Sequence, residues 1–264
     1  YKKDVDQEKL AVTNAYIVTA SKTWENGRWV LPKPAVWLQL WRQIGEEGTP
    51  ELVPDVLPLE LPNPPTYSGN NGTATVTWTG VDAENVGGAP YIFTVKEGTY
   101  SEVEGVWVFT ESTPENFTAT PYAEGTGITN SYNSPTTEIK ATKTWVGYQA
   151  TRPTVWFRLE RRIDGGAWGG ATPYAPFGAP LKELANGTTT ATWENLPTTD
   201  DQGRPYRYQV REVDADNNLF TPPNYTKNES GLGVTNRYTV SATKTWENGR
   251  YVDPKPELQF ELWR

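Results

Sequence analysis

A lysine sits on an otherwise apolar strand face at three places in the sequence. The motif SKTW at 21–24 returns as TKTW at 142–145 and at 243–246. Because alternate residues of a β-strand point to the same side, each lysine shares its side with residues typical of a core. The three faces are Val18, Ala20, Lys22 and Trp24; Ile139, Ala141, Lys143 and Trp145; and Val240, Ala242, Lys244 and Trp246. A buried ammonium is unfavourable without a partner, so these lysines are candidates for chemistry.

A glutamate and an asparagine break the apolar alternation of two later strands in the same way. The glutamate faces are Tyr91, Phe93, Val95 and Glu97, and Tyr206, Tyr208, Val210 and Glu212. The asparagine faces are Ile128, Asn130 and Tyr132; Val234, Asn236 and Tyr238; and Val12, Asn14 and Tyr16. The sequence therefore predicts two complete sets of one Lys, one Glu and one Asn, each aimed at a core. Asn14 and Lys244 belong to incomplete sets.

Two interpretations of such a set are open. In the first, Lys and Glu form a buried salt bridge and the Asn amide completes its hydrogen bonds. In the second, burial drives the lysine toward the neutral amine and the glutamate toward the neutral acid. The acid then polarises the Asn carbonyl and shuttles protons while the amine attacks. The products are ammonia and an amide between the two side chains.

The elements that would position these residues are short β-strands. Thr, Val, Tyr and Trp are abundant, Gly and Pro are spread throughout, and helical periodicity never lasts more than a turn or two. Second core strands are expected at Val36, Leu38 and Leu40, at Val155, Phe157 and Leu159, and at Leu258, Phe260 and Leu262. Middle strands are expected at 74–78 and 190–193. About seven short strands at regular spacing are typical of a β-sandwich. The Pro-rich insert at 45–65 is expected to form an ordered surface loop and no added sheet.

Internal repetition gives the domain organisation. The sequence at 12–42 returns at 234–264, an offset of 222 residues, and a weaker copy begins at Ile139. We therefore expect two complete domains, at 16–133 and 134–238. Residues 1–15 would end a preceding domain, and 239–264 would begin a following one.

Composition excludes several classes of function. A net charge of −8 with scattered basic residues argues against nucleic acid as a partner. The absence of Cys and His removes disulfides, thiol chemistry, the commonest metal ligand and the usual general base, so no cofactor and no metal are expected. No apolar run is long enough for a membrane span in this fragment.

The order of these motifs resembles a known family. A KTW strand comes near the start, a Y-x-V-x-E-like strand late and a TN-x-Y strand at the end, as in the Cna protein B-type repeats of Gram-positive surface adhesins and pilins. The resemblance covers essentially the whole chain, with Phe93 where the Tyr of the second motif falls.

The resemblance implies tandem immunoglobulin-like β-sandwiches in an elongated array, with a spontaneous isopeptide bond in many members. By motif position, Lys22 would join Asn130 with Glu97 as the promoting acid, and Lys143 would join Asn236 with Glu212. Asn14 and Lys244 would be halves of bonds whose partners lie outside this window.

Three functions follow as hypotheses. The first is a structural stalk or fibre repeat of an extracellular, cell-surface or cell-wall-attached protein. It would not be an enzyme beyond one bond-forming event per domain. Its partners would be adjacent repeats of the same chain, with lateral self-association or a host ligand engaged through other regions. The second is a glycan- or matrix-binding module that uses exposed Trp residues, which a coplanar row of solvent-facing rings would favour. The third, a hydrolase using Glu97 or Glu212, needs a second carboxylate within reach, which the apolar strands disfavour.

Overall fold

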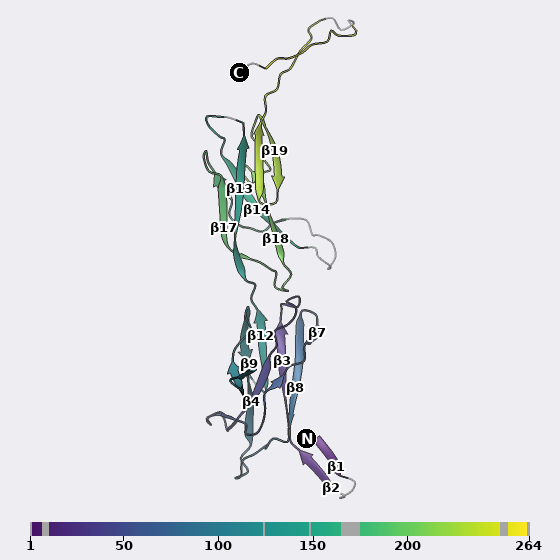
Figure 1. Ribbon diagram of the computed structural model, residues 1–264, viewed down its shortest axis with the longest axis vertical. Helices are drawn as coiled ribbons and strands as arrows, with labels where there is room; N and C mark the ends of the chain where they lie inside the picture. Colours follow the sequence, from purple (N-terminus) through teal and green to yellow (C-terminus); the bar gives the residue numbers. More distant parts are fainter. Residues whose placement is uncertain are drawn as a thin grey trace. The chain divides into compact units, whose positions relative to one another are not determined.

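The computed structural model describes residues 2–6, 11–123, 125–147, 149–164, 175–248 and 253–262 (Figure 1). These residues contain strands and turns but no helix, and so no helix that could span a membrane. The strands are β1 (Lys2–Asp6), β2 (Ala11–Ala15), β3 (Ile17–Glu25), β4 (Trp37–Ile44), β5 (Glu51–Leu52), β6 (Leu59–Glu60), β7 (Thr66–Ser68), β8 (Asn71–Thr79), β9 (Tyr91–Val103), β10 (Val106–Glu111), β11 (Phe117–Pro121), β12 (Gly127–Tyr132), β13 (Thr136–Val146), β14 (Val155–Ile163), β15 (Ala175–Pro176), β16 (Lys182–Leu184), β17 (Thr190–Pro197), β18 (Tyr206–Val213), β19 (Tyr225–Ser230) and β20 (Gly233–Tyr238).

The chain divides into two compact units, with the main boundary near residue 137 and with residues 195–206 grouped with the first unit. In the first unit one sheet has the order β11-β12-β3-β8-β7 and the other the order β10-β9-β4-β5, with β6 also paired to β4. Apolar side chains from both sheets form one core, in which Ala20 of β3, Leu38 of β4 and Ile128 of β12 are all buried. This arrangement confirms the predicted two-sheet sandwich.

The second unit repeats this plan with fewer strands. One sheet has the order β17-β13-β20-β19, and the other consists of β15, β14 and β16 with β18 paired to β14. Val155, Phe157 and Leu159 of β14 are buried, as their alternation predicts, and so is Trp193 of β17. A separate two-stranded sheet, β1 with β2, lies at the start of the chain.

In each unit the first and last strands are parallel neighbours in the middle of a sheet. β12 runs beside β3, with Ile128 opposite Lys22 and Asn130 opposite Trp24. β20 runs beside β13 in the same register, with Val234 opposite Lys143 and Asn236 opposite Trp145. The connection between such strands passes through all the other strands of the unit. Residues far apart in sequence therefore meet on one face.

The insert at 45–65 was wrongly predicted to add no sheet. Its strands β5 and β6 pair antiparallel with β4, through Trp41 opposite Leu52 and Leu38 opposite Leu59. Val53 and Leu61, just beyond these strands, are buried in the core. These strands cannot be recognised from the sequence because the prolines interrupt the alternation of apolar and polar residues. Here each pairing lasts only two residues, so Pro54 and Pro62 follow it where no further ladder hydrogen bond is needed.

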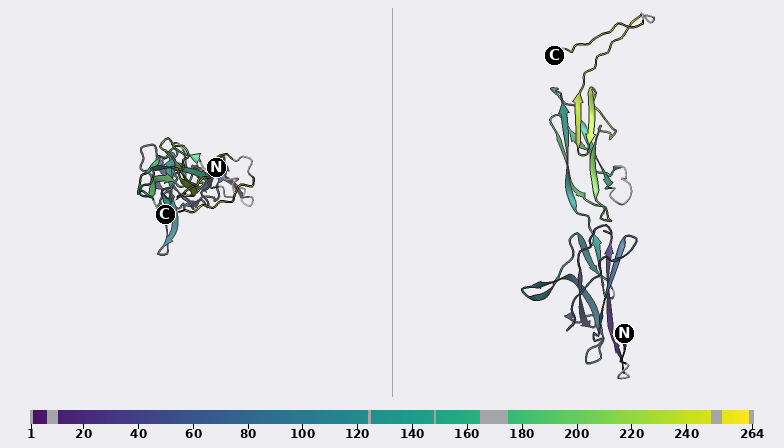
Figure 2. Two further views of the ribbon diagram at one scale, coloured as in Figure 1. Left: turned by 90° about the horizontal axis from the view of Figure 1, so that it is seen from above. Right: turned by 45° about the vertical axis from the view of Figure 1, so that its right-hand side comes forward.

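The hairpin of β9 and β10 is a second feature absent from the sequence interpretation. β9 continues six residues past Glu97 and turns back at Glu104 and Gly105, both with positive φ, into β10. Figure 2 shows this teal hairpin projecting from the first unit. Most side chains of β10 are exposed, so the hairpin lacks the buried alternation that marks the lysine, glutamate and asparagine strands.

The third KTW copy does not form the predicted strand. Within 239–248 and 253–262 the structure has no strand, and the side chains expected in a core are exposed. These side chains are Val240, Trp246, Leu258, Phe260 and Leu262. An isolated segment cannot bury one face or pair its backbone groups, and the part of the chain that the structure describes supplies no neighbouring strand for it.

Candidate isopeptide sites

The first site joins Lys22, Glu97 and Asn130. Lys22 and Asn130 come from the parallel pair β3 and β12, and Glu97 comes from β9 in the opposite sheet. Lys22 Nζ donates a hydrogen bond to Glu97 Oε2, and Asn130 Nδ2 donates to Glu97 Oε1 over 2.8 Å. Lys22 and Asn130 are fully buried, and Glu97 is 5% exposed. The three residues singled out by alternation therefore meet inside the sandwich.

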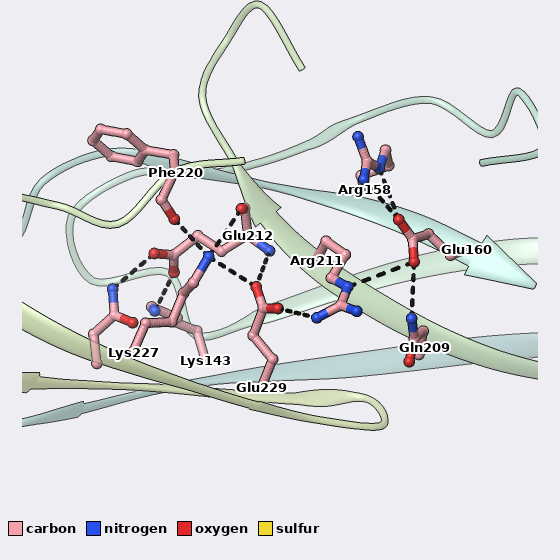
Figure 3. Close-up of polar contacts among 10 residues, drawn as sticks. Lys143, Arg158, Glu160, Gln209, Arg211, Glu212, Phe220, Lys227 and Glu229 are labelled. Atoms are coloured by element: carbon pink, nitrogen blue, oxygen red, sulfur yellow. Dashed lines mark hydrogen bonds and ion pairs between the residues drawn. The ribbon is translucent and has the colours of Figure 1, made fainter. Parts of the chain in front are cut away.

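The second site repeats this geometry with Lys143, Glu212 and Asn236. Lys143 Nζ donates to Glu212 Oε2, and Asn236 Nδ2 donates to Glu212 Oε1 over 2.9 Å. Figure 3 shows Lys143 and Glu212 facing each other between the strands. Glu212 and Asn236 are fully buried, and Lys143 is 3% exposed. One carboxylate thus holds both the amine and the amide in each unit.

Burial dominates the electrostatics of both lysines. It lowers the pKa of Lys22 from its usual value to about 8, although the charge and hydrogen bond of Glu97 act in the opposite direction. Burial also lowers the pKa of Lys143, against the hydrogen bond and charge of Glu212. Desolvation destabilises an ammonium relative to an amine. Both lysines are therefore closer to the nucleophilic form than a lysine in water.

The asparagine carbonyl has no hydrogen-bond partner in either site. Asn130 Oδ1 and Asn236 Oδ1 are buried, and no donor among the described residues reaches them. An unsatisfied buried acceptor is unfavourable by about 1–3 kcal/mol. The amide nitrogen, in contrast, is anchored on the carboxylate. The carboxylate thus binds each amide through Nδ2, the nitrogen that would leave as ammonia. The carbonyl oxygen remains available to accept a proton.

A second cation contacts the KTW tryptophan in each unit, which sequence reasoning missed. Lys33 Nζ lies 5.8 Å from the centre of the Trp24 ring and donates to the carbonyl of Gly27. Arg152 lies 5.6 Å from the Trp145 ring and donates to the carbonyl of Gly147 over 2.7 Å. Burial lowers the pKa of Lys33 to about 8. In the sequence, both cations could have been recognised as a basic residue three to four positions before the second core strand.

The incomplete sets remain incomplete in the described residues. Asn14 lies in β2 opposite Lys3 of β1, and its side chain is outside the described part. Lys244 is exposed, with its Nζ 5.1 Å from the centre of the Trp246 ring. The described residues show no Glu or Asn side chain bound to Lys244.

The tryptophan residues do not form a flat platform in the described residues. Trp24, Trp78 and Trp193 are buried in cores. Trp37, Tyr100 and Trp107 follow one another at ring distances of 5.2 and 5.1 Å, but their planes are tilted by 57° and 38°. Sugar rings stack on coplanar faces, so this row does not favour the glycan-binding hypothesis. No group of three or more Asp or Glu side chains among the described residues could hold a metal.

Comparison with known proteins finds a family model that matches part of the chain. Residues 139–237 match the model of the Cna protein B-type domain. A collagen adhesin of Staphylococcus aureus is 37% identical over 126 residues, which are 46% of this chain and 10% of the adhesin. The chain therefore spans a small part of that relative's length.

Two solved structures show weaker likeness. One contains two B repeat units of the collagen-binding protein of Staphylococcus aureus and is 21% identical, with a TM-score of 0.45. The match covers 90% of this chain and 54% of that chain. The major pilin of a Streptococcus pyogenes serotype is 13% identical, with a TM-score of 0.29, and 86% of this chain and 100% of the pilin are covered. The family match at residues 139–237 includes the second Lys, Glu and Asn set.

Proposed function

We propose that each unit forms one intramolecular isopeptide bond, from Lys22 to Asn130 and from Lys143 to Asn236. Glu97 and Glu212 promote the two reactions. The observation that supports this proposal is the shared carboxylate: in both sites one buried Glu binds the lysine Nζ with one oxygen and the asparagine Nδ2 with the other. The salt-bridge interpretation also places the amide on the carboxylate, but it does not account for the asparagine carbonyl, which has no donor among the described residues.

The reaction needs no group beyond these three side chains. The lysine ammonium passes a proton to the carboxylate, and the neutral amine attacks Cγ of the asparagine. In the tetrahedral intermediate, the glutamate carries a proton from Nζ to Nδ2, so that ammonia leaves and the Nζ–Cγ bond remains. Overall, a lysine ammonium and an asparagine amide become one secondary amide and one ammonium ion. Each domain reacts once, and no turnover follows.

The bonds suit a load-bearing role, and we propose that this chain is a stalk or fibre repeat of an extracellular surface protein. The 222-residue repeat, the Cna B-type match and the similarity to a collagen adhesin support this role. In this proposal the domains are 16–133 and 134–238, the segments 1–15 and 239–264 belong to neighbouring domains, and adjacent repeats are the partners.

The intact mass of the folded protein tests the bonds. We expect a deficit of two ammonia molecules against the sequence mass, and peptide mapping should find Lys22 linked to Asn130 and Lys143 to Asn236. Glu97→Ala should restore one ammonia and Glu212→Ala the other, because each removes one proton carrier. Glu111→Ala is the control, since Glu111 is exposed on the neighbouring strand β10. Full sequence mass in folded protein would sink the proposal.

A further inference from the structure

The second unit differs from the first beside its glutamate. In β19, Lys227 pairs with Asn236 and Glu229 with Val234. In β11 the same register places Ala119 opposite Asn130 and Pro121 opposite Ile128. Thus Ala119 corresponds to Lys227, and Pro121 corresponds to Glu229. A charged pair in one unit is replaced by two small side chains in the other.

In the second unit this pair holds the backbone of Glu212. Glu229 Oε1 accepts the backbone N–H of Glu212 over 2.9 Å. Lys227 Nζ lies 3.4 Å from the Glu212 carbonyl oxygen, 2.7 Å from that of Phe220 and 2.9 Å from Glu229 Oε1. Figure 3 shows the side chains of Lys227 and Glu229 joined to each other and to the Glu212 main chain by dashed lines. The Glu212 carbonyl also accepts the backbone N–H of Phe220, so the side chains of β19 bind the Glu212 N–H and give its carbonyl a second donor.

The pair is itself anchored. Arg211 Nη1 donates to Glu229 Oε2 over 2.5 Å, and the Arg211 guanidinium also contacts Glu160. Although burial acts in the opposite direction, hydrogen bonds from Arg211, the Glu212 N–H and Lys227 lower the pKa of Glu229. Its side chain is 12% exposed and that of Lys227 14%. A charged, hydrogen-bonded pair of this kind has little freedom to move.

The need for such an anchor follows from the strands. In the first unit Glu97 lies in a paired region of β9, with Leu38 opposite it in β4, and its carbonyl accepts the backbone N–H of Ser112 just beyond β10. In the second unit β18 ends at Val213, and among the described strands it pairs only with β14. An edge strand leaves one row of backbone groups without a strand partner. In that row the Glu212 carbonyl accepts the backbone N–H of Phe220 over 3.2 Å, as the Glu97 carbonyl accepts that of Ser112, and the Glu212 N–H is bound by Glu229 of β19.

The exchange also changes the space around the glutamate. In the first unit a pocket of about 650 Å³ is lined by Glu97, Ile128, Ala119 and Pro121, together with Trp41 of β4, Glu111 of β10 and other residues of β9. At the positions of Ala119 and Pro121, the second unit carries the longer, ion-paired side chains of Lys227 and Glu229. The first glutamate thus lies beside a pocket, and the second lies beside an ion pair that binds its backbone N–H.

We propose that Lys227 and Glu229 are positioning residues for isopeptide formation in the second unit. They fix the main chain of Glu212 so that its carboxylate spans Lys143 and Asn236. The proposal rests on the proposed isopeptide reaction and adds residues outside the Lys, Glu and Asn set. It also states that the two bonds of one chain depend on different supports.

The test follows both bonds in the same full-length chain. The protein is synthesised in a short pulse of cell-free translation and then incubated at neutral pH. Samples taken over time are quenched in acid and digested, and the amount of each cross-linked peptide pair is measured by mass spectrometry. In the double variant Lys227→Ala with Glu229→Pro, which carries the residues of the first unit, the Lys143–Asn236 bond should form at least about tenfold more slowly. The Lys22–Asn130 bond should keep its rate and serves as the internal control.

A conservative pair of variants separates position from stability. Glu229→Gln keeps an oxygen that can accept the Glu212 N–H, so the second bond should form within about twofold of the original rate. Glu229→Ala removes this acceptor and should slow it by about tenfold. Near-ultraviolet circular dichroism shows whether each variant is folded. If the double variant does not fold, the rates of the Glu229→Gln and Glu229→Ala variants still test the positioning role.

The outcomes separate this inference from the proposed function. If the unmodified chain forms neither bond, the isopeptide proposal itself fails. If it forms both, and folded Glu229→Ala or the double variant forms the second bond at the original rate, the positioning role is overturned. If Glu229→Gln and Glu229→Ala slowed the second bond equally, the positioning role would also be overturned. The loss of the Glu229 charge, and not of the acceptor for the Glu212 N–H, would then explain the effect.

Discussion

At the scale of single residues, one carboxylate with two oxygens organises each site. Glu97 and Glu212 each receive a lysine on one oxygen and an asparagine amide on the other. A buried ion pair alone often contributes little to stability, because desolvation offsets the attraction. We therefore propose that the arrangement seen in both units serves a reaction rather than stability. In the unreacted state each site should be strained by its buried charge.

The pH dependence of an unreacted variant measures this strain. Asn130→Ala removes the electrophile, so Lys22 stays a titratable amine. Its pKa in the folded state is about 8, against 10.5 as the usual value, so the unfolded chain binds more protons between these two pH values. Stability should therefore be greatest above about pH 10.5, fall as the pH decreases toward 8, and stay level below. The difference should be about 3 kcal/mol.

Urea unfolding at pH 7.5 to 10.5 checks this expectation. The control is the double variant Lys22→Met with Asn130→Ala, in which the titrating amine is gone and other groups are unchanged. Subtracting its free energy of unfolding isolates Lys22. A difference between the two variants that does not change with pH would contradict the lowered pKa.

At the scale of elements, the alternation of side chains predicts most of what matters for the site. It placed Lys22, Glu97 and Asn130 on inward faces because a period of two leaves no choice of side once a strand forms. It could not show that β3 and β12 are parallel neighbours, since strand order depends on contacts distant in sequence. For the same reason it missed Lys227 and Glu229, whose relation to Glu212 appears only through the register of β19.

The strands of the insert were missed because local sequence and tertiary structure disagree there. Prolines argue against a sheet, yet β4 offers an edge with unpaired backbone groups, and a two-residue pairing fits between successive prolines. Val53 and Leu61 then close the core. An insert that looks like a surface loop is in this way part of the sandwich.

Substitution in the insert tests this role. Leu61 is 6% exposed, so Leu61→Ala should lower the free energy of unfolding of the first unit by about 2–5 kcal/mol through lost burial and a cavity. Leu57→Ala is the matched control, because Leu57 is 68% exposed in the same insert and should change stability by less than about 0.5 kcal/mol. Both are measured by urea unfolding in the Asn130→Ala background. Equal effects of the two substitutions would show that the insert does not belong to the core.

At the scale of the whole molecule, the parallel pairing of first and last strands determines how each unit meets a pulling force. The chain enters the first sandwich at the start of β3 and leaves it at the end of β12, and these ends lie at opposite ends of the parallel pair. A force along the chain therefore shears this pair. An amide bond from Lys22 to Asn130 would join the two strands directly and close a loop of roughly 100 residues. By analogy with a disulfide, such a loop stabilises the fold by about 4–5 kcal/mol.

Single-molecule stretching of the full chain tests the load path. With both bonds formed, the residues between each bonded pair cannot extend, since the force passes through the amide. Glu97→Ala should then add one unfolding event that releases roughly 350 Å of chain, at about 3.3–3.6 Å for each of roughly 100 residues. Glu212→Ala should add a somewhat shorter event from the second unit, whose bonded residues are closer in sequence. Glu111→Ala should leave the trace unchanged. If the trace of the original chain already showed both long extensions, the force would not pass through a covalent bond in either unit.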